Sequence, residues 1–232
     1  MSRKLFGTDG IRGVAGQPPM DARTAYALGI ALGNWIHSAS QPRHVMLGMD
    51  TRESGVWLAE SVAAGLAARK VEARFAGVIT TPGVAYLART GEFAAGVMIS
   101  ASHNPFADNG LKVFDHSGFK MPDDQEVRLE RDIFDWLEKG LEPERLTLLA
   151  DESLDRQYVD FLVSTMQTRS RSAFGCCSAE ITRAIENGAS CFALSSMFST
   201  SSPIMVSLSA SFSSGSSVSR CSFSQESVNF MV

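Results

Sequence analysis

The sequence predicts a three-layer α/β/α domain with a mixed sheet over roughly residues 1–140. Helical and strand patterns alternate along this part of the chain, and short turns rich in Gly, Pro and Asp separate them. One expected hairpin joins strands that are otherwise connected by helices, which indicates a mixed sheet. Hydrophobic residues make up 44% of the 232-residue chain, enough to form a core.

The first expected helix begins after Asp21, whose carboxylate can accept hydrogen bonds from free amides of the first turn. Apolar residues then recur at helical spacing from Ala25 to Ile36. Residues 44–48 form a short apolar run typical of a buried strand. After the polar turn 50–55, an aliphatic stripe predicts a second helix, and residues 71–76 are expected to form the next strand.

A turn at Thr81-Pro82-Gly83 is expected to open a short helix over residues 84–89, because proline is tolerated in a first helical turn. The strand 95–99 then delivers the chain to Ser100. Later elements are expected to be a hairpin, with residues 111–114 and 119–120 flanking the turn 115–118, and an amphipathic helix over 123–139.

Residues 141–169 are expected to form a helical exit from the first domain toward a second one. Four apolar or aromatic residues support this expectation: Leu154, Tyr158, Phe161 and Leu162.

Composition changes sharply near residue 170. Residues 170–232 hold 20 serines in 63 positions and no Lys, Asp, His, Trp or Tyr. We expect this serine-rich tail to have low order, although the alternation of apolar residues and serine over 206–213 would also suit an exposed strand. The tail also contains the four cysteines, whose spacing fits neither a metal site nor a disulfide framework. We interpret them as reduced or incidental.

The charge of the chain limits the kinds of partner that it is expected to bind. The net charge is −4 and the chain has no polybasic tract, so we expect no nucleic acid and no membrane among its partners. The first residues lack the apolar stretch of a secretory signal, and a cytoplasmic location is the default expectation. The sequence does not indicate an oligomeric state.

The loop from Ser100 to Gly110 is the segment most suited to chemistry. It follows an expected buried strand and consists of small and polar residues whose backbone amides could face an anion. Ser102 needs a base, a metal or prior phosphorylation to take part in group transfer, and His103 and Lys112 are the nearest candidates for support. By composition alone, the same residues would also suit an ordinary turn.

Four ordered motifs resemble the successive signatures of the α-D-phosphohexomutase family, over roughly residues 3–169. The form Thr-Asp-Gly-Ile-Arg-Gly and the form His-Asn-Pro-Phe-Ala-Asp-Asn-Gly-Leu-Lys are most similar to the bacterial phosphoglucosamine mutase branch. The matching segments are residues 6–13, 48–55, 80–82 and 99–112.

The resemblance implies a sugar-phosphate mutase. In the family, the serine at the position of Ser102 carries a phosphoryl group, which passes to a sugar monophosphate and forms a bound bisphosphate. The bisphosphate then turns over and returns its other phosphate. For this branch the net reaction interconverts glucosamine 6-phosphate and glucosamine 1-phosphate, which feeds UDP-N-acetylglucosamine and cell-wall synthesis.

The resemblance also implies roles for individual residues. Arg12 matches a family arginine near the phosphoserine, and its planar fork suits phosphate. Lys112 matches the lysine assigned to acid and base work at the sugar hydroxyl. His103 matches a histidine that hydrogen-bonds the substrate or the phosphoryl group.

Three further residues are expected to support this loop. Asp50 and Arg52 match a signature that braces the active-site loops, and Asn104 is expected to hold the loop shape. The family uses one Mg²⁺ per active site, which would meet this chain through the phosphate of Ser102. The Asp-rich metal loop, the sugar-binding loop and the terminal phosphate loop of the family do not occur in these 232 residues.

Two hypotheses follow for the chain as a whole. The first is a phosphoglucosamine mutase whose chain is incomplete or altered after residue 169, because the serine-rich tail resembles an out-of-frame translation or a truncated gene. The second is a catalytically inactive module that binds a sugar phosphate or a protein partner.

Overall fold

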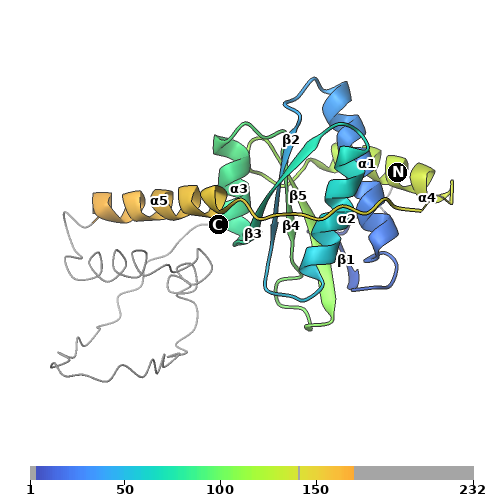
Figure 1. The fold of residues 1–232 in the computed structure, drawn as a ribbon, viewed down its shortest axis with the longest axis horizontal. Coiled ribbons are helices and arrows are strands. Elements are labelled where there is room, and N and C mark those ends of the chain that lie inside the picture. The colour runs from blue at the N-terminus through green and yellow to red at the C-terminus, as the bar shows by residue number, and fades with distance from the viewer. Residues whose placement is uncertain (1–3, 141, 170–232) are drawn as a thin grey trace. The chain divides into compact units, whose positions relative to one another are not determined.

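The computed structural model describes residues 4–140 and 142–169. Five strands form one mixed sheet, and Figure 1 shows how its helices surround it. The strand order is β1-β5-β4-β2-β3. β2 is parallel to β3 and to β4, whereas β5 is antiparallel to β4 and to β1. The strands are β1 (Ile11–Val14), β2 (His44–Met49), β3 (Glu72–Val78), β4 (Ala95–Ile99) and β5 (Asp108–Asp115).

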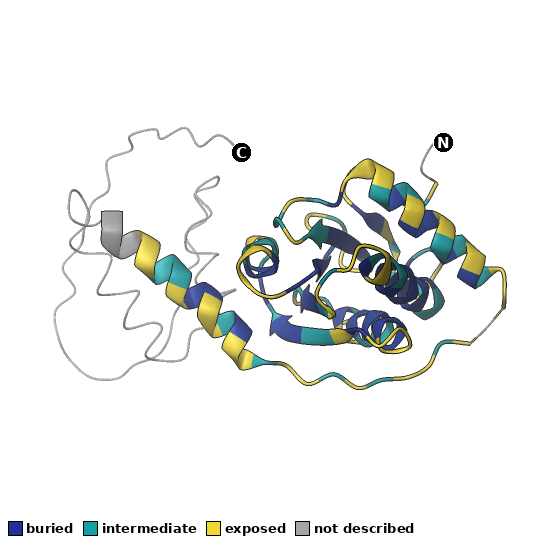
Figure 2. Cartoon of the chain, turned by 90° about the horizontal axis from the view of Figure 1, so that it is seen from above, coloured by how far each residue is buried: buried dark blue, intermediate teal, exposed yellow. Residues whose placement is uncertain are grey.

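Helices cover both faces of the sheet, which confirms the expected α/β/α class. Side chains from α1, α2 and α4 share one buried cluster with Val45 and Leu47 of β2. Met46, between them in the strand, belongs to a second cluster with residues of α3 and α5. Figure 2 shows these buried positions on the sheet and on the inner sides of its helices. The helices are α1 (Ala22–Ser38), α2 (Gly55–Ala67), α3 (Thr81–Thr90), α4 (Asp123–Leu137) and α5 (Glu152–Arg169).

Side-chain caps fix two of the helix starts. Asp21 Oδ1 accepts a hydrogen bond from Thr24 N at 2.8 Å, as the sequence predicts for α1. Thr80 Oγ1 accepts one from Gly83 N at 3.3 Å, so α3 begins at Thr81 and includes the predicted turn. Proline in the first turn does not interrupt α3, because that position needs no amide donor.

The mixed sheet is confirmed, but it does not arise from the predicted hairpin. The predicted turn does form, with Asp115 N donating to Phe119 O and Met121 N to Val113 O, both at 2.9 Å. Residues 119–120 add one isolated bridge, between Phe114 and Lys120, and no full strand before the chain turns into α4. The antiparallel partners of β5 are instead β4 and β1. β1 was not predicted as a strand, because its four residues carry no clear local pattern and its pairing partner lies about a hundred residues away.

A close crossing of α1 and α2 supports the sheet from one side. A Cβ atom added to Gly65 would lie 2.1 Å from Tyr26 O, and one added to Gly29 would lie 2.2 Å from Val62 O. Real Cβ atoms do not approach this closely, so each helix backbone rests on a glycine of the other. This contact fixes the spacing of the two helices.

The helix expected within residues 141–169 is present as α5, and residues 142–151 before it are not helical. Leu154 and Tyr158 are buried, and the rings of Tyr86 and Phe161 stack at a centroid distance of 4.0 Å. The serine-rich tail, with the four cysteines and the alternating stretch 206–213, lies outside the described residues. Within residues 4–140 and 142–169, no helix is long and apolar enough to cross a membrane.

Candidate active site

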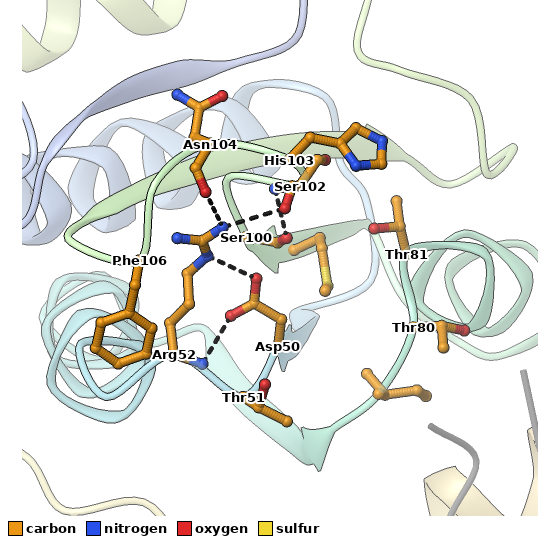
Figure 3. Close-up of a pocket in the computed structure, with 12 residues that line it drawn as sticks. Asp50, Thr51, Arg52, Thr80, Thr81, Ser100, Ser102, His103, Asn104 and Phe106 are labelled. Carbon is orange, nitrogen blue, oxygen red and sulfur yellow. Dashed lines mark hydrogen bonds and ion pairs between the residues drawn. The ribbon is translucent and has the colours of Figure 1, made fainter. Parts of the chain in front are cut away.

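A polar pocket of about 510 Å³ lies where three parallel strands end. β2 leads into Asp50, β3 into Ile79 and β4 into Ser100, and all three residues line the pocket. Because the carboxyl ends of parallel strands meet at one edge of a sheet, loops distant in sequence come together there. Figure 3 shows the pocket with the Ser102 loop on one side and Thr80 and Thr81 on another.

Ser102 stands at the exposed tip of its loop. Its backbone φ is 55°, in the left-handed region that residues other than glycine rarely adopt. Its amide donates to Ser100 Oγ at 3.1 Å, which helps to hold this conformation. His103 is exposed beside it and also lines the pocket. Ser102 is therefore an accessible residue on a loop with a fixed conformation.

A buried lysine holds the Ser102 hydroxyl. Lys112 lies on β5 opposite Met98 of β4, and its side chain is only 8% exposed. Its Nζ donates to Ser102 Oγ at 2.8 Å and lies 2.9 Å from Asp9 Oδ2. A buried ammonium needs such partners, because burial of an unpaired charge is costly. Sheet register thus places the Lys112 ammonium and the Ser102 hydroxyl, both predicted site groups, at hydrogen-bond distance.

Asp9 is a site residue that was not predicted. Its Oδ2 lies 2.5 Å from Arg12 Nη2 as well as 2.9 Å from Lys112 Nζ, so one carboxylate joins the two cations. Its turn is closed by a hydrogen bond from Gly7 N to Gly10 O at 2.9 Å. Gly10 has a φ of 90° and packs so tightly that an added Cβ would lie 2.2 Å from Leu111 O. This packing sets the turn beside Lys112.

The charges around Asp9 determine its protonation. Partial burial alone would raise the pKa of the Asp9 carboxyl. The hydrogen bond and charge of Lys112, followed by those of Arg12, outweigh that effect, and the net pKa is lowered. Asp9 stays ionised below the pH at which an ordinary aspartate takes up a proton. The sequence signal was its place in the same Gly-rich motif as Arg12.

Arg52 ties the Ser102 loop to the end of β2. Its guanidinium donates to the carbonyl oxygens of Ser102 at 3.1 Å and Asn104 at 2.9 Å. It also donates to those of Pro105 at 2.6 Å and Asp108 at 2.9 Å. Asp50 Oδ2 in turn receives Arg52 Nε at 3.1 Å. These contacts are drawn in part in Figure 3.

Asn104 adds a link within the loop. Its Nδ2 donates to Asp108 Oδ2 at 2.9 Å, and its amide donates to Ala101 O at 3.2 Å. The structure therefore collects the seven predicted residues into two neighbouring groups. In the first, Ser102 contacts Lys112 directly, and Asp9 joins Lys112 to Arg12. In the second, Asp50, Arg52 and Asn104 hold the loop, with His103 next to Ser102.

The described residues do not fit a complete site for a divalent cation. Within that part of the chain, no three His, Cys, Asp or Glu side chains gather so that they could hold a metal ion. Mg²⁺ prefers octahedral oxygen ligands. The charged group nearest to the Ser102 hydroxyl is the ammonium of Lys112, which repels a cation, and a phosphoryl group on Ser102 would supply a negatively charged oxygen ligand there.

Comparison with known proteins gives a consistent family. Residues 3–139 match the family described as phosphoglucomutase/phosphomannomutase, alpha/beta/alpha domain I. A phosphoglucosamine mutase of Solibacter usitatus is 57% identical over 169 residues, which are 73% of this chain and 38% of that protein. Another, of Koribacter versatilis, is 46% identical over 177 residues, 74% of this chain and 38% of its own length. The chain thus spans less than half of these relatives.

Solved structures agree with the fold. A phosphoglucomutase/phosphomannomutase family protein of Burkholderia thailandensis superposes with a TM-score of 0.57 at 26% identity, covering 69% of this chain and 35% of that one. A putative phosphomannomutase of Thermus thermophilus gives 0.58 at 26% identity, covering 71% and 37%. The family match covers more than half of the chain. The chain therefore belongs to the phosphoglucomutase/phosphomannomutase family, and residues 3–139 are an α/β/α domain I of that family.

Proposed function

We propose that this chain acts in the interconversion of glucosamine 6-phosphate and glucosamine 1-phosphate, with Ser102 as the phosphoryl carrier. The observation that carries the proposal is the 2.8 Å hydrogen bond between Lys112 Nζ and Ser102 Oγ on a loop held by Arg52. Relatives named phosphoglucosamine mutase support the choice of sugar. Since the chain spans 38% of those relatives, the activity of the whole enzyme is part of the proposal.

The first transfer moves the phosphoryl group from Ser102 to the sugar. The bond between Ser102 Oγ and phosphorus breaks while a bond from phosphorus to a sugar hydroxyl oxygen forms. The proton of that hydroxyl passes to Lys112 Nζ, in the role that the family resemblance gives this residue, while Lys112 gives one of its own protons to the departing Ser102 Oγ, to which it is hydrogen-bonded. The product is a bisphosphate that stays bound.

The second transfer reverses these steps at the other end of the sugar. Phosphorus of the other phosphate bonds to Ser102 Oγ, whose proton passes to Lys112 Nζ, while the bond from phosphorus to the sugar oxygen breaks and Lys112 gives a proton to that oxygen. Arg12 would contribute positive charge near the transferring group, and His103 would contact it or the substrate. Asp50, Arg52 and Asn104 would keep the loop in its fixed conformation.

A metal ion is expected from the family but has no complete set of ligands among the described residues. Mg²⁺ bound to the phosphoryl group of Ser102 would neutralise charge on the transferring group, with further oxygen ligands coming from outside those residues. A cytoplasmic location and a sugar phosphate as the main partner complete the proposal.

The second candidate is an inactive module that binds a sugar phosphate without turning it over. The two candidates share the Ser102 pocket and differ in chemistry alone.

A coupled assay separates the candidates. The purified chain is supplied with glucosamine 6-phosphate, Mg²⁺ and a sugar bisphosphate primer, beside Ser102→Ala and Lys112→Met. Lys120→Met is the matched control, because Lys120 is another partly buried lysine but pairs with Glu126. The mutase predicts turnover that both site variants abolish and the control retains. Binding of glucosamine 6-phosphate without turnover favours the module, and full activity of Ser102→Ala contradicts the phosphoserine.

A further inference from the structure

One buried carboxylate of α4 accepts hydrogen bonds from the backbone of residues 4–6. Glu130 is 7% exposed, and its Oε1 accepts a hydrogen bond from Lys4 N at 2.7 Å. Its Oε2 accepts from Leu5 N at 2.8 Å and from Phe6 N at 3.2 Å. Three successive amides thus point at a single side chain. Hydrogen bonds to an ionised acceptor are stronger than neutral ones, so this contact fixes residues 4–6 firmly.

Residues 4–6 lead directly into the turn that carries Asp9. Phe6 is buried at 3% exposure, and the Gly7–Gly10 turn follows it without a spacer. On its other side the turn is packed at Gly10 against β5. The turn therefore has two anchors, the strand that holds Lys112 and the helix that holds Glu130.

We propose that Glu130 is a positioning residue that holds residues 4–6 and thereby places the Asp9 carboxylate between Lys112 and Arg12. The geometry of α4, the N-terminal segment and β5 carries this inference by itself. Its consequence for phosphoryl transfer, a correctly placed Lys112 and Arg12, rests on the proposed function. Glu130 touches neither cation, so it acts on them through the turn.

The same helix supplies a matched control. Glu126 lies one turn before Glu130, is fully buried, and receives Lys120 Nζ at 2.9 Å. Loss of either carboxylate removes a buried charge from α4, but only Glu130 is hydrogen-bonded to the amides of residues 4–6. A general weakening of α4 would therefore appear on replacement of either residue, whereas a positioning effect would appear only on replacement of Glu130.

Two readouts on the 232-residue chain test the proposal without any turnover. The first is hydrogen exchange of the amides of residues 4–10. The second is the pKa of the Asp9 carboxyl, followed by its ¹³C chemical shift, because that pKa reports the cations facing it, Lys112 and Arg12. The variants are Glu130→Ala, which removes the acceptor, Glu130→Gln, which keeps one oxygen, and Glu126→Ala.

Glu130→Ala is expected to speed exchange in residues 4–10 by about tenfold or more and to move the Asp9 pKa up toward its ordinary value. Glu130→Gln should do so to a smaller extent, and it is the variant to compare if the alanine variant does not fold. Glu126→Ala should change neither readout.

Unchanged exchange and an unchanged Asp9 pKa in both Glu130 variants would overturn the proposal. So would faster exchange spread equally over α4 and the sheet, since that shows general destabilisation. Failure of the mutase assay would leave both readouts intact, so the positioning role and the proposed function fail separately.

Discussion

Replacement of Arg52 by alanine tests how the Ser102 loop is held. The side chain of Arg52 is 10% exposed and donates to four loop carbonyls and to Asp50, which is 15% exposed. The variant leaves the Asp50 carboxylate in a poorly solvated place without its guanidinium. It also removes every link from the end of β2 to these carbonyls.

The expected loss of stability follows from these contacts. A hydrogen bond to a charged group contributes about 1.5–3 kcal/mol, but loop carbonyls near the surface regain water when the guanidinium is lost. Removal of one partner of a largely buried ion pair costs about 3–5 kcal/mol. We therefore expect Arg52→Ala to lower the free energy of unfolding by about 3–5 kcal/mol rather than by the sum of all five contacts.

Urea unfolding followed by tryptophan fluorescence measures this loss. With a slope of about 2 kcal/mol per molar urea, the midpoint should fall by about 1.5–2.5 M. Arg52→Lys keeps the charge but not the planar fork, and should recover less than half of the loss. Arg156→Ala, which breaks an exposed pair with Asp160 at 3.9 Å, should cost less than about 0.5 kcal/mol. If the urea midpoint of Arg52→Ala is as close to that of wild type as the midpoint of Arg156→Ala, the contacts of Arg52 do not stabilise the fold as expected here.

Three further predictions concern other contacts. Gly65→Ala should lower the free energy of unfolding by about 2–3 kcal/mol in thermal melts, because its Cβ would meet Tyr26 O; an unchanged melt would show that α1 and α2 can separate freely. The ionised form of Asp9 is favoured in the folded state, so its stabilising effect is present above the ordinary aspartate pKa and disappears as pH falls through the lowered one. Asp9→Asn should therefore be less stable than wild type near neutral pH and equal to it in strong acid, and a constant difference would contradict the ion pairs. Burial alone would lower the pKa of Lys120, but hydrogen bonds with Glu126 and Asp123 outweigh it and raise the pKa. The stability that Lys120 adds should therefore be lost as pH rises through that raised pKa. Urea titrations of wild type against Lys120→Met measure this loss.

The fold was predictable where local patterns match the structure. The cap at Asp21, the buried run of β4 and the charged face of α4 each specify their element within a few residues. β1 was not predictable in this way, because Ile11–Val14 becomes a strand only through its pairing with β5. The expected second strand of the hairpin contributes one bridge, because α4 begins directly after Pro122.

The candidate site shows the same limit. Motif order predicted that the loop of Ser102 and the strand of Lys112 belong to one site, and β4–β5 register brings these two side chains to 2.8 Å. Asp9 shares the Gly-rich motif with Arg12, but it was not selected from the sequence, because a shared motif does not show that one carboxylate will join two cations. Glu130 lies more than a hundred residues from the amides that it binds, and no local pattern marks such a contact. The roles proposed for these residues stay predictions.

Locating the phosphoryl group on the chain is the most direct test of Ser102 as the phosphoryl carrier. The purified chain is incubated with the sugar bisphosphate and measured by intact mass and by peptide fragmentation, in parallel with Ser102→Ala. We predict a mass increase of one phosphoryl group, located on Ser102 and absent from the variant. A phosphoryl group that persists in Ser102→Ala, or a wild-type chain that takes up none, would contradict it.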